Sequence, residues 1–135
     1  MKSVYQYHKG NDPAELRSQV AEVYRVMAHH EQILASRFLE FLNQKKNVRI
    51  IGDPSADKML RVPTISFVVE GRKSSEIPVL VDPHKIGIRY GDFYARQLIT
   101  DLDLLENDGV IRVSMVHYNT LEEVDRLIRV LDEII

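Results

Sequence analysis

The sequence predicts an α+β fold in which a small, mostly antiparallel sheet carries helices on one face. Apolar residues recur every three or four positions over about residues 13–45, which is the spacing of a long amphipathic helix. Short runs rich in β-branched residues then alternate with helical segments, and a strongly capped helix closes the sequence. In a chain of this length, that order favours a small sheet with helices packed against it.

Length and composition predict one domain, residues 1–135, that folds without disulfides or metals. A net charge of -2 gives no reason to expect a nucleic-acid partner. No apolar run approaches the ~20 residues of a membrane span, so we expect no membrane partner either. The sequence has no cysteine, which fits a reducing compartment, and we therefore expect a cytoplasmic protein.

The first expected element is a helix over about 13–45, and the α+β part follows over about 46–135. Asn11 and Asp12 precede Pro13, a typical start signal with proline in the first turn. The helix carries one apolar stripe. Its members are Leu16, Val20, Val23, Met27, Leu34, Phe38 and Leu42.

Short elements are expected in the middle of the chain. Residues 48–51 and 62–69 have the composition of strands, and glycine turns follow them. Ser74 or Ser75 is a suitable cap for a short helix that runs to about Val81. Residues 86–89 predict a further short strand.

The last third of the chain predicts a helix over 92–98, a strand over 110–116 and a terminal helix. Thr120 and Glu123 form a capping box, in which each side chain binds a free backbone amide of the first turn. This is the clearest element of the sequence. The apolar stripe expected to be buried behind the box consists of Leu121, Val124, Leu127, Ile128 and Leu131.

Two arginines are the main candidates for chemistry. Arg89 stands where a strand meets the turn at Gly91, and Arg112 alternates with apolar residues in the last strand. A guanidinium in such a setting can grip a carboxylate through two parallel hydrogen bonds, which a lysine cannot do. Each arginine alone could also be a strand residue that points to solvent or pairs with an acidic side chain.

The histidines do not predict a metal site. His29 and His30 are adjacent in a helix, so their side chains point about 100° apart and cannot share one ion. His84 and His117 are single histidines near strand ends, more typical of polar loops than of acid–base catalysis. The glycines are isolated, so no phosphate-binding loop is expected.

From about Val20 onwards the sequence resembles the C-terminal small domain of class V aminotransferase-fold enzymes. These pyridoxal-phosphate (PLP) enzymes of fold type I include cysteine desulfurases, selenocysteine lyases and isopenicillin N epimerase-like proteins. Four segments carry the resemblance in matching order and spacing: 61–67, 88–95, 110–120 and 122–127.

The resemblance implies roles for four residues. Arg112 stands at the position that binds the substrate's α-carboxylate, and Arg89 is a further substrate-binding residue that belongs, with Gly91, to the active-site loop bordering the substrate. Tyr94 occupies the position where desulfurases carry the persulfide-forming cysteine. A phenol cannot accept sulfur as a thiolate does, so a transaminase, lyase or epimerase-like reaction on an amino acid is implied.

The family's PLP-binding lysine and phosphate loop lie in a preceding large domain. The resemblance therefore implies that this chain alone binds no cofactor and contains no catalytic residue. It also implies that the chain works with a large domain that is missing or separately encoded, and that the enzyme is a homo-oligomer. The alternative is a free-standing, non-catalytic module that binds a small anion or drives oligomerisation. An exposed patch on the first helix and at Val4 to Tyr7 would favour the first interpretation.

Overall fold

The computed structural model describes residues 13–135. The start signal at Asn11 and Asp12 and the aromatic segment from Val4 to Tyr7 lie outside the described residues. In chain order the elements are α1 (Pro13–Gln44), β1 (Val48–Ile51), β2 (Thr64–Val69), α2 (Glu76–Val81), the 3-10 turn η2 (Asp82–His84), β3 (Arg89–Gly91), α3 (Arg96–Asp101), β4 (Val110–Ser114) and α4 (Leu121–Ile134).

The four strands form one sheet in the order β1-β2-β4-β3, and every neighbouring pair is antiparallel. The α+β fold with a small antiparallel sheet is therefore confirmed. Side chains along each strand point alternately to the two faces. Ile65, Phe67, Ile111 and Val113 point to one face and are at most 3% exposed.

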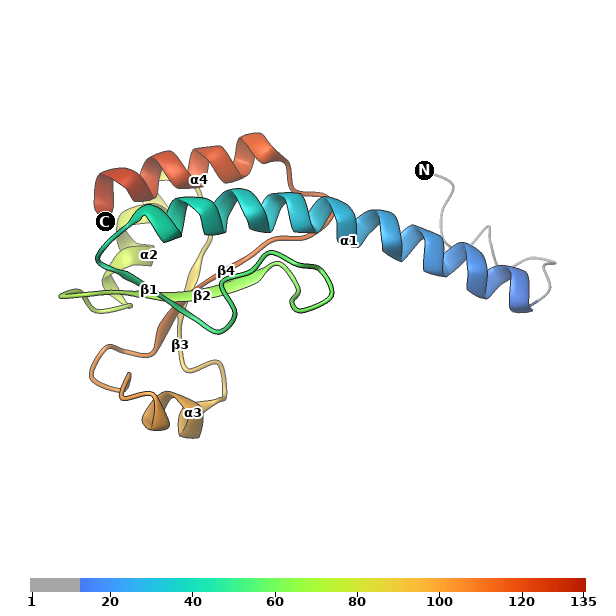
Figure 1. Ribbon diagram of the computed structural model, residues 1–135. Coiled ribbons are helices and arrows are strands. Elements are labelled where there is room, and N and C mark those ends of the chain that lie inside the picture. The colour runs from blue at the N-terminus through green and yellow to red at the C-terminus, as the bar shows by residue number, and fades with distance from the viewer. Residues whose placement is uncertain (1–12) are drawn as a thin grey trace.

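Three helices cover that face of the sheet, as expected (Figure 1). The second half of α1 lies beside α4, and α2 packs into the same core. The most deeply buried members are Leu34, Phe38, Leu42, Ile77, Val81 and Leu131. The short helix α3 is the exception, because it lies on the other side of the sheet and forms a second cluster with Val68 and Val110.

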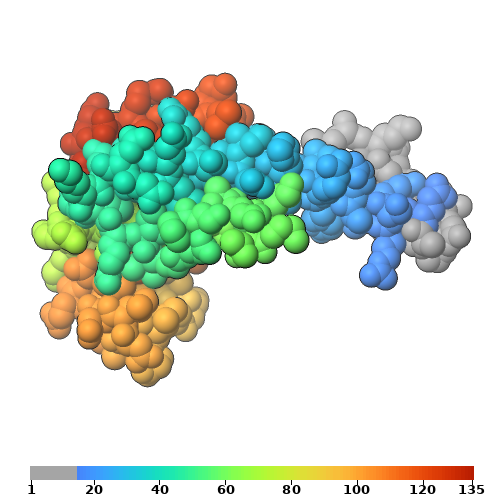
Figure 2. Space-filling model, in the orientation of Figure 1, coloured from blue at the N-terminus to red at the C-terminus, as the bar shows by residue number. Residues whose placement is uncertain are grey.

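The two halves of α1 have different environments. Leu34 and Phe38 are fully buried, whereas Val20 and Val23 on the same stripe are 38% and 40% exposed. The first half extends beyond the body of the molecule, as Figure 2 shows in blue. The apolar stripe predicted from the sequence is therefore covered over only part of its length.

Several predicted boundaries were wrong. The strand expected at 86–89 is β3, Arg89–Gly91, and the helix expected at 92–98 is α3, which starts four residues later at Arg96. Ser75 precedes α2, but its hydroxyl donates to Asp108 instead of capping the helix. The strand expected at 62–69 begins only at Thr64, and the strand expected at 110–116 already ends at Ser114.

The capping box of α4 is confirmed. The Thr120 hydroxyl accepts from the backbone amide of Glu123 at 3.3 Å, and the Glu123 carboxylate accepts from that of Thr120 at 3.0 Å. The predicted stripe behind it needs two corrections: Val130 is also buried in it, and Leu121 is 40% exposed.

Candidate functional site: the open face of the sheet

We call the sheet face turned away from α1 and α4 the open face. One row of residues crosses it from strand to strand: Ile51 pairs with Ser66, Ser66 with Arg112, and Arg112 with Arg89. Residues directly opposite each other in an antiparallel pair point to the same face. The sheet register therefore brings Arg89 and Arg112 together, although the sequence separates them.

Arg112 lies near the centre of this row. Its neighbours Ile111 and Val113 are buried under the helices, so the alternation of the strand directs Arg112 to the open face. The side chain is half-buried, and its guanidinium carbon lies 3.7 Å from the centre of the Phe93 ring. At that distance the planar cation is stacked on the ring.

Arg89 lies beside it on the edge strand β3 and is exposed. Within residues 13–135, neither guanidinium forms a salt bridge or a side-chain hydrogen bond, although acidic side chains pair with other arginines such as Arg25 and Arg37. Two adjacent positive charges repel each other and create a positive potential. The open face is therefore suited to bind an anion.

The loop after β3 shapes the edge of this site. Gly91 has φ +131°, and Phe93 and Tyr94 both adopt left-handed backbone conformations, with φ of 51° and 65°. The Asp92 carboxylate accepts a hydrogen bond from the Tyr94 amide at 3.0 Å, and the Ala95 amide donates to the Asp92 carbonyl at 2.8 Å. The turn closed by Asp92 explains why α3 starts later than the sequence suggested.

Tyr94 is placed differently from the other candidates. Its side chain is fully exposed, while Phe93 from the same loop turns inward onto Arg112. The structure thus brings Arg89, Arg112 and Phe93 together and leaves the Tyr94 phenol in solvent.

A network at the start of α4 fixes the segment that follows β4. The Asn119 side chain accepts from the Val116 amide and donates to Glu123, and the Asn119 carbonyl lies 2.8 Å from His30 Nε2. Hydrogen bonds from Asn119 and from the Thr120 backbone lower the pKa of Glu123. Hydrogen bonds at the helix start, chiefly from its own backbone amide, also lower the pKa of Glu122. The network holds the end of β4 and the start of α4 in a fixed position relative to each other.

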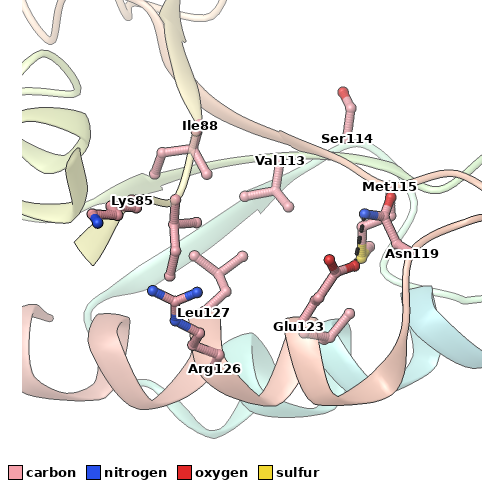
Figure 3. Close-up of a pocket in the computed structure, with 12 residues that line it drawn as sticks. Lys85, Ile88, Val113, Ser114, Met115, Asn119, Glu123, Arg126 and Leu127 are labelled. Atoms are coloured by element: carbon pink, nitrogen blue, oxygen red, sulfur yellow. Dashed lines mark hydrogen bonds between the residues drawn. The ribbon is translucent and has the colours of Figure 1, made fainter. Parts of the chain in front are cut away.

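Behind the sheet, a cavity of about 230 Å³ opens between β4, α4 and the loop before β3. Figure 3 shows its apolar floor and the polar side chains of Arg126 and Glu123 from α4. Val113 lines the cavity, so the cavity lies on the opposite side of β4 from Arg112. It is not part of the open face.

Other classes of site receive no support from the described part of the chain. Within residues 13–135, no three His, Asp or Glu side chains gather in a way that could hold a metal ion. His117 and Glu31 approach to 3.8 Å, and this contact links the segment after β4 to α1. None of the described helices is long and apolar enough to cross a membrane.

Sequence reasoning missed three features of the site. Phe93 was placed in a helix, whereas the structure stacks its ring on Arg112. Ser66 was treated only as a strand residue, yet it is the direct neighbour of Arg112 on β2. Gly109 contacts the backbone of Gly91. Only for Phe93 did the sequence contain a signal, because Asp92 is a residue type that closes such turns.

Comparisons with known proteins agree on one family. The family model for Aminotransferase class-V matches residues 19–127. An aminotransferase-like protein of Gibberella zeae is 42% identical over 115 residues, which are 84% of this chain and 29% of that protein. A cysteine desulfurase-like protein of Aspergillus flavus is 36% identical over 112 residues, 81% of this chain and 26% of that protein. The chain thus spans less than a third of either relative.

Solved structures show the same fold. The apo cysteine desulfurase of Thermococcus onnurineus matches with a TM-score of 0.71 at 25% identity, covering 88% of this chain and 29% of that one. An Escherichia coli cysteine desulfurase matches with a TM-score of 0.64 at 23% identity, covering 76% and 24% of the two chains.

Proposed function

Since the chain belongs to the class V aminotransferase family, we propose that it forms the substrate-side domain of a PLP-dependent enzyme that acts on an amino acid. The family is PLP-dependent, and the chain covers 29% of the Gibberella zeae relative. The observation that carries the proposal is the open face, where Arg112 and Arg89 lie side by side with no anionic partner among the described residues.

In this proposal Arg112 binds the α-carboxylate of the substrate. A planar guanidinium presents two parallel N–H groups to the two carboxylate oxygens, and this geometry fixes orientation as well as position. Arg112 is suited to this role because β4 and Phe93 hold it while its hydrogen-bonding edges have no partner in the described part of the chain. Arg89 strengthens the positive potential beside it.

In this proposal the cofactor is held by the rest of the enzyme and not by this chain. A PLP site needs a lysine for covalent attachment and donors for the phosphate, but the open-face row consists of Ile51, Ser66, Arg112 and Arg89. Lys45 and Lys73 pair with aspartates elsewhere, and Lys85 lines the cavity on the other side of β4. Bound in the rest of the enzyme, PLP would supply the electron sink for bond cleavage at the α-carbon. This chain would bind and orient the substrate, and alone it would be inactive.

The residue at position 94 limits the reaction class. A desulfurase relay needs a nucleophilic thiolate, and the chain has no cysteine. Tyr94 presents an exposed phenol instead, which cannot accept sulfur as a thiolate does. We therefore favour transaminase, lyase or epimerase-like chemistry over a persulfide relay through this loop.

The first half of α1 favours the interpretation that the chain is part of a larger enzyme over the alternative of a free-standing module. Leu16, Val20, Val23 and Met27 line an apolar hollow of about 520 Å³, and Tyr24 beside them is 67% exposed. A stand-alone domain tends to bury such a continuous apolar surface. Contact with the remainder of a longer enzyme would cover it.

A chimeric enzyme tests the proposal. The chain replaces the matching segment of the Gibberella zeae relative, and turnover of a panel of amino acids is measured together with the absorbance of bound PLP. We expect the chimera to turn over an amino acid, and Arg112→Lys to lose about 100-fold in turnover with PLP retained, because the substrate would be misplaced.

Arg129→Lys is the matched control, because Arg129 is an exposed arginine on α4, across the sheet from the open face. It should leave turnover unchanged. An Arg112→Lys chimera as active as its parent would refute the assignment of the carboxylate site. Failure of both the parent and the control to turn over any amino acid would count against the proposed enzyme class.

A further inference from the structure

The Phe93 ring lies against the Arg112 guanidinium. The geometry points to Phe93 as a positioning residue, which holds the guanidinium flat so that its edge meets a substrate carboxylate. This inference rests on the proposed function and deepens it, because it assigns part of the affinity for the carboxylate to a residue that does not touch the substrate.

The stack leaves the binding edge of Arg112 free. The ring covers one face of the guanidinium, with 3.7 Å between the guanidinium carbon and the ring centre. A carboxylate approaches in the plane of the guanidinium and hydrogen-bonds to its N–H groups, so both partners can be bound at once. The ring and the carboxylate therefore do not compete for the same surface.

The backbone of the loop that carries Phe93 has an unusual conformation. Phe93 has φ 51° and Tyr94 φ 65°, a conformation that costs energy for residues other than glycine. The Asp92 carboxylate holds the turn through the Tyr94 amide at 3.0 Å. In this turn Phe93 points inward onto Arg112, while Tyr94 next to it is fully exposed.

Phe93 also connects Arg112 to the small core under α3. Its partly buried ring packs against the cluster of Val68, Ile99, Leu104 and Val110. Those residues are at most 4% exposed, so the ring packs against a rigid support. α3 and its cluster therefore help to position Arg112, although no residue of α3 belongs to the open-face row.

The expected effect is on preorganisation. A long arginine side chain that is free before binding loses about 0.5–1.5 kcal/mol of rotamer freedom when a ligand immobilises it. A residue that immobilises Arg112 beforehand removes that cost, which corresponds to about two- to ten-fold in affinity. The gain in affinity requires a flat ring at position 93. Phe93→Tyr should therefore keep it, and Phe93→Leu should lose it.

Side-chain dynamics of the full 135-residue chain provide the first test. NMR relaxation of the Arg112 Nε–H group is compared in the parent, Phe93→Leu, Phe93→Tyr and the control Tyr118→Leu, an exposed aromatic residue away from the loop. We expect the order parameter to fall below about 0.6 only in Phe93→Leu. An unchanged value in Phe93→Leu, with the fold intact by its backbone spectrum, overturns the inference whether or not a ligand binds.

Binding of L-alanine, with L-alaninamide as the analogue without a carboxylate, separates this inference from the proposed function. Phe93→Leu should raise the dissociation constant of L-alanine about two- to ten-fold, and Phe93→Tyr should restore it. If Arg112→Lys weakens binding and Phe93→Leu does not, the inference alone is wrong. If Arg112→Lys binds L-alanine as well as the parent does, the proposed function is wrong.

Discussion

A Cβ atom on Gly109 would lie 2.3 Å from the carbonyl oxygen of Gly91. The two glycines bring the segment before β4 against the end of β3, where the loop that carries Phe93 begins. Gly109 has φ +78°, so it also needs the left-handed conformation that glycine adopts most easily. The position of the loop beside Arg112 thus depends on the absence of a side chain at Gly109.

Gly109→Ala should destabilise the protein by more than about 2 kcal/mol, because backbone strain and a backbone clash add. Urea unfolding measures the change. Gly71→Ala is the control, since Gly71 has φ +76° but an added Cβ would have no neighbour within 4 Å. It should cost only about 1 kcal/mol. Equal costs for the two variants would show that the Gly91 contact is unimportant.

Arg89→Gln should stabilise the chain slightly. Arg89 and Arg112 lie directly opposite each other, and like charges in that arrangement cost about 0.2–1 kcal/mol. The gain in unfolding free energy should appear at low salt and shrink in 1 M salt, where screening is strong. A gain that does not depend on salt would mean that repulsion between the two arginines is not its cause.

The capping box predicts that the stability of the protein depends on pH. Hydrogen bonds from Asn119 and Thr120 lower the pKa of Glu123 below its unfolded value of about 4.3. The stabilisation is therefore complete above that value and is lost as the pH falls through the lower, folded pKa. We expect the melting temperature of the parent to exceed that of Glu123→Gln at neutral pH, and the difference to shrink below about pH 4.

Glu106→Gln is the control for this series, because Glu106 is exposed and lies outside the α4 capping network. Its melting curve should follow that of the parent over the whole range. A constant difference between the parent and Glu123→Gln down to pH 2 would contradict the role of the ionised carboxylate.

The helix α1 predicts a contrast between two apolar residues on one stripe. Leu34 is fully buried, so Leu34→Ala should cost about 2–5 kcal/mol of unfolding free energy. Val23 is 40% exposed, so Val23→Ala should change the unfolding free energy by less than about 0.5 kcal/mol. Thermal or urea unfolding measures both. A large loss for Val23→Ala would mean that the isolated chain buries this half of the helix.

The best-predicted elements depend on contacts between residues close in sequence. The helix α4 was recognised because Thr120 and Glu123 are three residues apart and satisfy each other's backbone amides. The alternation around Arg112 also predicted a strand with one polar face. The start of α3 was predicted wrongly, because the turn closed by Asp92 overrides the helical tendency of residues 92–95.

By itself, the sequence determined the α+β class, the long first helix, the capped last helix and the arginines available to bind an anion. Periodicity and local hydrogen bonding specify such features, because they require only neighbouring residues. Only the tertiary structure decided that Arg89 pairs with Arg112, that Phe93 stacks on Arg112, and that the first half of the α1 stripe is not fully buried. Those outcomes depend on sheet register and packing between distant segments, which no local pattern encodes.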